Sequence, residues 1–169
     1  RFQDAFDVYS DGVRLNVDVK AAGKKKNKDL LFKSFLNFQK AVMYSNRAAC
    51  CMAMANFMAA SNDCAKALCL RPDWLKPMLR KARASIALAE SLPVRWQSSL
   101  VTAIADLEKL VKAASTNSTD VEAPTIYAAA QAELLKAHKL QTEMQDRQQR
   151  EKERMREQRE KERAREQRE

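Results

Sequence analysis

The stretch AVMYSNRAACCMAMANFMAASNDCAKALCLRPDWLKPMLRKAR, residues Ala41 to Arg83, indicates the fold of the whole chain. Read at a period of about 34 residues, it places small residues where two antiparallel helices must approach closely. These positions hold Ala48, Ala60 and Ala67. Pro72 follows the second helix, which a proline cannot continue. The stretch therefore predicts a unit of two packed helices.

The composition favours an all-α fold and argues against catalysis. The 169 residues are 46% hydrophobic and 31% charged, with only 2 Gly and 4 Pro, which is typical of helical proteins. One histidine, no phosphate-binding glycine loop and no Ser/His/Asp arrangement predict that the chain is not an enzyme and needs no cofactor. No apolar run approaches the roughly 20 residues that span a bilayer. We expect a soluble cytoplasmic protein without a membrane partner.

The net charge of +9 lies mainly outside the expected core. Lysines concentrate between Asp18 and Lys40, and a second charged run extends from Arg150 to Glu169. A polybasic run can bind nucleic acid, but no interleaved aromatic residues accompany this one, so a solvated loop is favoured. The run from Lys24 to Lys28 leaves a nuclear signal, and hence a nuclear location, open as an alternative.

The four cysteines predict packing and no metal site. Cys50, Cys51, Cys64 and Cys69 contain no C-x-x-C pair, and the single histidine, His138, lies far away in the sequence. Free thiols among small and apolar neighbours behave as small hydrophobic groups. Reduced cysteines also fit the cytosol or the nucleus.

Periodicity divides the chain into six segments. They are the second helix of a truncated unit (1–16), a lysine-rich insertion leading into an extended helix (17–40), a central unit (41–74), a third unit with a long inner loop (75–114), a linker (115–124), and a capping helix that continues as a charged, solvated helix (125–169). The extended helix is expected to begin near the N-cap residue Asp29. The inner loop is expected from Ser91 to Ser99. Because the chain starts inside a unit, we expect it to be a piece of a longer protein.

The end of the chain repeats itself. Arg150 to Gln158, REKERMREQ, recurs almost unchanged as Arg159 to Gln167, and it has too few apolar residues for a coiled-coil seam. Ion pairs at helical spacing would stabilise such a helix. The predicted pairs are Glu151/Arg154, Glu153/Arg156, Glu157/Lys161 and Glu160/Arg163.

The run from Tyr44 to Ala48, followed by Arg71 to Lys76 and by Arg80, resembles the tetratricopeptide repeat (TPR), and within that family its carboxylate-clamp members. The resemblance implies a right-handed superhelix of helical hairpins. It also implies a co-chaperone function, with the acidic EEVD-type C-terminal tails of seventy- and ninety-kilodalton heat-shock chaperones as partners. Repeats that run into a long charged helix look like the TPR co-chaperones that carry a J domain after the repeats.

The resemblance assigns peptide-carboxylate binding to Asn46, Lys76 and Arg80. Lys76 and Arg80 are four residues apart, hence on one helical face, and successive first helices would bring them to one groove with Asn46. Further groove contacts are expected from Ser45, Ala49, Leu79 and Arg83. The first unit lacks the helix that supplies a lysine and an asparagine in the family, so the clamp is incomplete. The alternative is a TPR scaffold in an unrelated complex that binds no peptide carboxylate.

Overall fold

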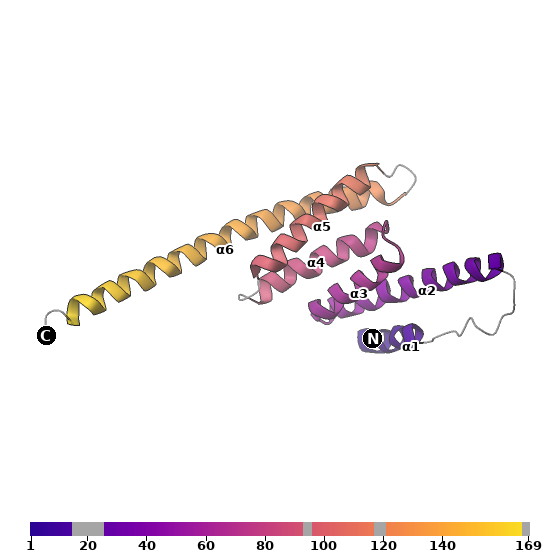
Figure 1. Ribbon diagram of the computed structural model, residues 1–169, viewed down its shortest axis with the longest axis horizontal. Helices are drawn as coiled ribbons and strands as arrows, with labels where there is room; N and C mark the ends of the chain where they lie inside the picture. The colour runs from indigo at the N-terminus through magenta and orange to yellow at the C-terminus, as the bar shows by residue number, and fades with distance from the viewer. Residues whose placement is uncertain (15–25, 93–95, 117–120, 167–169) are drawn as a thin grey trace.

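Helices make up the regular structure of the described residues, and no strand occurs among them (Figure 1). The computed structural model describes residues 1–14, 26–92, 96–116 and 121–166. The helices are α1 (Phe2–Arg14), α2 (Lys26–Ala53), α3 (Phe57–Leu70), α4 (Leu75–Ser91), α5 (Trp96–Thr116) and α6 (Ala123–Glu166). The prediction of an all-α fold is confirmed.

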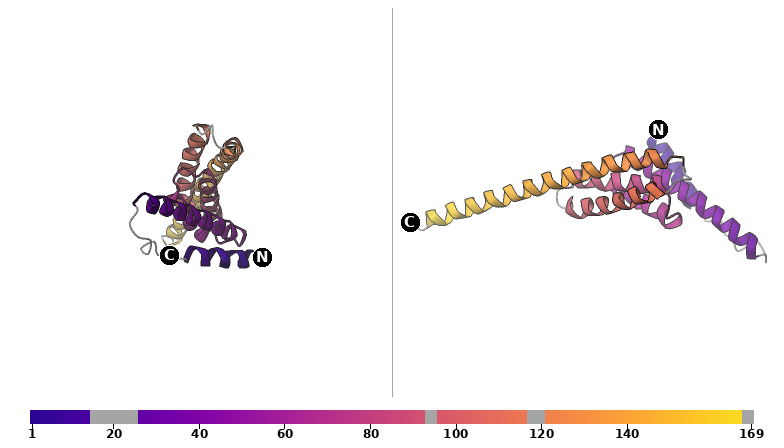
Figure 2. Two further views of the ribbon diagram at one scale, coloured as in Figure 1. Left: turned by 90° about the vertical axis from the view of Figure 1, so that its right-hand side faces the viewer. Right: turned by 90° about the horizontal axis from the view of Figure 1, so that it is seen from above.

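The helices form a stack in which each one packs on the next along the chain (Figure 1). In addition, α4 contacts both α2 and α6, so these three helices lie beside one another on one side of the stack. The N-terminal end of α2 and the C-terminal half of α6 project beyond their neighbours (Figures 1 and 2). The side shared by α2, α4 and α6 is where the predicted clamp residues lie.

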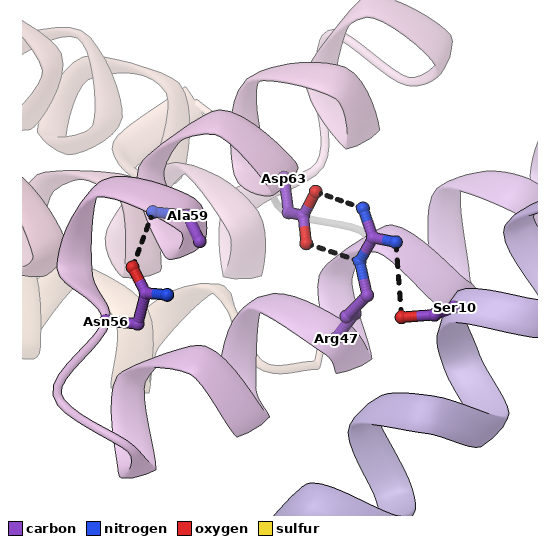
Figure 3. A network of polar contacts seen from close by, with 5 residues as sticks. All are labelled: Ser10, Arg47, Asn56, Ala59 and Asp63. Carbon is purple, nitrogen blue, oxygen red and sulfur yellow. Dashed lines mark hydrogen bonds and ion pairs between the residues drawn. The ribbon is translucent and has the colours of Figure 1, made fainter.

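A tight turn reverses the chain between α2 and α3. Ala55 adopts a left-handed conformation with φ of 56°. The Asn56 N–H donates to the carbonyl of Cys51 at 2.8 Å, and the Ala55 N–H donates to that of Met52 at 3.1 Å, as in a Schellman motif. The side chain of Asn56 then caps α3 by accepting from the Ala59 N–H at 3.2 Å (Figure 3).

Replacing Ala55 with glycine should stabilise the protein by about 0.5–1 kcal/mol, because glycine adopts the left-handed conformation without steric cost. Urea unfolding followed by circular dichroism measures the change. Ala53→Gly, at the last helical residue of α2, is the matched control and should destabilise, since glycine is a poor helix former. A loss of stability for Ala55→Gly would contradict the prediction.

The larger of two apolar cores lies between α4, α5 and α6. Leu100, Leu107 and Leu110 of α5 are fully buried, and their spacing places them on one helical face. From α6, Ile126, Ala130 and Ala137 complete this core; other apolar residues of both helices surround them. The first half of α6 is therefore held by packing, whereas its second half is not.

A smaller core of short side chains joins α2, α3 and α4. Cys51, Ala60 and Ala84 are fully buried there, with Phe6 of α1 packed against them. Small residues at these positions let the helices approach closely, as the sequence predicts. At Gly12 of α1 the approach is closer still, because a Cβ atom would lie 2.6 Å from Sδ of Met43.

Two helices begin earlier than the sequence predicts. α2 begins at Lys26, ahead of the expected N-cap Asp29, and α5 begins at Trp96, inside the loop expected from Ser91 to Ser99. Trp96 is buried in the larger core, which favours continuing the helix back to this residue. The parts of the predicted insertion, inner loop, linker and tail at 17–25, 93–95, 117–120 and 167–169 lie outside the described residues.

Beyond Gln148, which accepts a hydrogen bond of 3.4 Å from Gln97 of α5, the residues of α6 from 149 to 165 are exposed (Figure 1). None of the four ion pairs predicted between Glu151 and Arg163 is formed, although all eight of these residues are described; along α6 the recorded pair is Lys139–Glu143 at 3.9 Å. That part of the prediction is wrong. Holding two long exposed side chains in one geometry costs entropy that offsets the attraction between them.

Candidate functional site

A buried ion pair joins α2 to α3 and reaches α1 (Figure 3). Arg47 of α2 donates two hydrogen bonds of 2.6 Å to the two carboxylate oxygens of Asp63 in α3. A third bond, of 3.4 Å, reaches Oγ of Ser10 in α1. The rings of Phe6 and Tyr44 lie 5.7 and 5.5 Å from the guanidinium, within the range of cation–π attraction.

The polar groups of this cluster are bonded to one another, and the ion pair is largely buried. The side chains of Arg47 and Asp63 are 16% and 5% exposed. The hydrogen bonds to Asp63 raise the pKa of Arg47, against the opposing effect of burial. We assign the pair a structural role, fixing how α3 and α1 each lie on α2. This pair is not evident in the sequence, because nothing local to either residue marks the other as its partner.

The candidate site is a groove of about 380 Å³ between α2, α4 and α6. Its lining combines an apolar surface with three cationic side chains. The residues are Ala49, Met52, Lys76, Leu79, Arg80, Arg83 and Ile126. Five of these, all but Met52 and Ile126, are among the residues that the sequence analysis singled out.

Arg80 is held in place by one edge of its guanidinium. Its NH1 nitrogen donates two hydrogen bonds of 2.7 Å to Ser45, one to the backbone carbonyl and one to the hydroxyl. Ser45 is buried and does not line the groove, so it positions Arg80 instead of contacting a ligand. In the part of the chain that the structure describes, Arg80 has no acidic partner, and its Nε and NH2 nitrogens make no hydrogen bond.

The other two cations are paired with acidic residues of α6 and the turn before it. Nζ of Lys76 lies 2.7 Å from Oε1 of Glu122, and Nε of Arg83 lies 2.7 Å from Oε1 of Glu133. Neither acid was among the site residues predicted from the sequence. Their positions carried a signal, because Glu122, Ile126 and Glu133 are separated by four and seven residues and so share one helical face.

Asn46 does not line the groove. It precedes Ala49 by three residues in α2, so the two positions are neighbours on the helix surface, with Asn46 beside the groove. Tyr44 and Trp74 do not line it either. The structure thus brings together Lys76 and Arg80 and leaves Asn46 next to them.

Two other hollows lie along α6 and are weaker candidates. They measure about 630 and 500 Å³, but side chains of the projecting helix alone form their walls. A hollow with one wall excludes little water, so the charges around it interact through a high dielectric. The groove has walls from separate helices and an apolar surface, which ligand sites typically have.

The cysteines do not form a reactive or metal-binding site in the described residues. Cys50, Cys51 and Cys64 are buried. Burial raises the pKa of Cys64 to about 12 and also raises the pKa of Cys51, which favours the protonated thiol at both positions. Cys69 is exposed, contrary to the packing predicted for it. No group of three or more metal-ligating side chains occurs in the described ranges.

Across residues 1–14, 26–92, 96–116 and 121–166, no helix has the length and apolar character that crossing a membrane requires. Comparison of the chain with models of known protein families, with curated proteins and with solved structures found no match.

Proposed function

We propose that the groove between α2, α4 and α6 binds the free C-terminal carboxylate of a partner protein. In this proposal the chain is a co-chaperone module, and its partners are the acidic EEVD-type tails of seventy- and ninety-kilodalton heat-shock chaperones. The observation that carries the proposal is Arg80: it lines the groove, is held by Ser45, and has no acidic partner among the described residues.

The packing of the helices supports a TPR superhelix. Helices α2 and α3 pack as one pair and α4 and α5 as the next, while α4 contacts both α2 and α6 on one side. In a TPR array the first helices of the repeats line the concave side, and the proposal assigns that role to α2 and α4. The first half of α6 covers the last pair and buries Ile126, Ala130 and Ala137, which fits a capping helix.

The chemistry of the groove suits a terminal carboxylate. The free edge of the Arg80 guanidinium offers two donors to the two oxygens of one carboxylate, in the bidentate geometry that arginine favours. Lys76 lies one helical turn before Arg80 and can add a second charge by leaving Glu122. Leu79, Met52 and Ile126 offer an apolar surface to the last side chain of the tail.

Calorimetry with a peptide ending in Glu-Glu-Val-Asp, as the free acid and as the amide, tests the proposal. We expect the free acid to bind about tenfold or more tightly, because a charge-assisted hydrogen bond contributes about 1.5–3 kcal/mol. Lys76→Ala and Arg80→Lys should each weaken the binding of the free-acid peptide and leave the binding of the amide unchanged. Lys109→Ala removes an exposed cation of α5 outside the groove and should change neither affinity.

Equal binding of acid and amide, with no effect of Lys76→Ala, would show that the groove is not a carboxylate site. A scaffold role for the stack or for the projecting half of α6 would then be the better account. Because Arg80 also bonds Ser45, the thermal stability of Arg80→Lys must be measured beside its affinity.

A further inference from the structure

Ion pairs form a seam between α4 and the first half of α6. Lys76–Glu122 and Arg83–Glu133 each measure 2.7 Å, and Glu90–Lys136 measures 3.0 Å. The pairs follow one another in the same order along both segments, so α4 and α6 run parallel. Two of the pairs use cations that line the groove, and the third lies beyond it.

The acids paired with Lys76 and Arg83 lie on the side of α6, and of the turn before it, that borders the groove. Ile126 lines the groove, and Glu122 and Glu133 stand four residues before it and seven after it, on the same side of the helix. The groove therefore has three cations and, at its edge, two carboxylates. Together these five side chains carry a net charge of +1. Arg80 is the cation among them that has no acidic partner in the described residues.

We infer that Glu122 and Glu133 determine the charge selectivity of the groove. By pairing with Lys76 and Arg83, they keep only Arg80 available to bind the C-terminal carboxylate of the ligand. They also repel further negative charges on the ligand. Among peptides with a free C-terminus, one with fewer acidic side chains before the terminus meets less repulsion from the two glutamates than a strongly acidic tail does. This inference rests on the proposed function and adds which tails the groove prefers.

The strength of the ion pairs determines the size of the effect. Lys76 and Glu122 are 50% and 49% exposed, and pairs of this kind contribute little. A strongly acidic tail can therefore displace the glutamates, but it does so against their attraction for Lys76 and Arg83. Selectivity of this kind comes from unfavourable charge contacts with the wrong ligand. Acidic tails should accordingly bind, but more weakly than the three cations alone would allow.

The test compares two free-acid peptides, ending in Glu-Glu-Val-Asp and in Gln-Gln-Val-Asp, on the wild-type chain and on the Glu122→Gln/Glu133→Gln variant. Glutamine keeps the shape of each side chain and removes its charge. We expect the variant to bind the first peptide about tenfold more tightly and the second about threefold, so the ratio of the two affinities shifts about threefold. Raising the salt concentration should reduce the shift.

Glu90→Gln is the matched control, because it makes the same change in the same seam outside the groove. It should leave the ratio unchanged. The inference is overturned if the double variant leaves the ratio unchanged, or if Glu90→Gln shifts it as much. In both cases the proposed function still stands if the wild-type chain binds the free-acid peptide more tightly than the amide. Loss of that preference would overturn the function and this inference together.

Discussion

Replacing Arg47 with methionine should lower the free energy of unfolding by about 3 kcal/mol or more. The substitution keeps an apolar stem between Phe6 and Tyr44 but leaves the carboxylate of Asp63 buried without its partner. Removing one member of a buried ion pair typically costs about 3–5 kcal/mol, because the remaining charge has lost its solvation and its compensation. Urea unfolding followed by circular dichroism and by tryptophan fluorescence measures the change.

Two further variants separate the loss of the pair from the loss of the side chain. Arg83→Met breaks the more exposed pair with Glu133 and should cost less than about 1 kcal/mol. Arg47→Met/Asp63→Leu removes both buried charges and should recover much of the loss, since apolar replacement of a whole pair is often neutral. Equal effects of Arg47→Met and Arg83→Met would contradict the assignment of the buried pair as the stronger structural contact.

Replacing Leu107 with alanine should destabilise the protein by about 3 kcal/mol. Leu107 is fully buried in the core between α4, α5 and α6. Truncation of a buried leucine loses the transfer free energy of the removed atoms and leaves a cavity that the neighbouring helices fill only partly, at a typical cost of about 2–5 kcal/mol. The midpoint of urea unfolding should fall with little change in slope.

Val101→Ala on the same helix is the control. Val101 is 58% exposed, so its truncation should change the stability by no more than about 0.5 kcal/mol. If Leu107→Ala costs no more than Val101→Ala, the core between α5 and α6 does not contribute the stability that its burial implies. The first half of α6 would then be poorly anchored, and the charge effect of Glu122 and Glu133 on the groove would weaken with it.

The candidate site was partly predictable from the sequence. Lys76, Leu79, Arg80 and Arg83 are neighbours on one face of α4, and this spacing follows from helical periodicity alone. Whether Asn46 reaches the groove cannot be predicted from helical periodicity, because it depends on how α2 is rotated against α4. The structure places Ala49 and Met52 toward the groove and leaves Asn46 beside it.

Local signals in the sequence were sufficient for the helices. Apolar periodicity, small residues and Pro72 act within a few residues of one another, so they determine where helices run almost independently of the rest of the chain. The early start of α5 at Trp96 is an exception with a tertiary cause, since the indole is buried by residues far away in the sequence.

Which charges meet was decided only by the tertiary structure. Arg47 finds Asp63 across the α2–α3 crossing, and Lys76 and Arg83 find Glu122 and Glu133 because α6 docks parallel to α4. A charged side chain reaches only a few ångströms, whereas the helices that carry these residues are brought together by the burial of apolar surface elsewhere. The sequence thus determined the cations of the groove, and helix packing decided that two of them would be neutralised and one, Arg80, left without an acidic partner among the described residues.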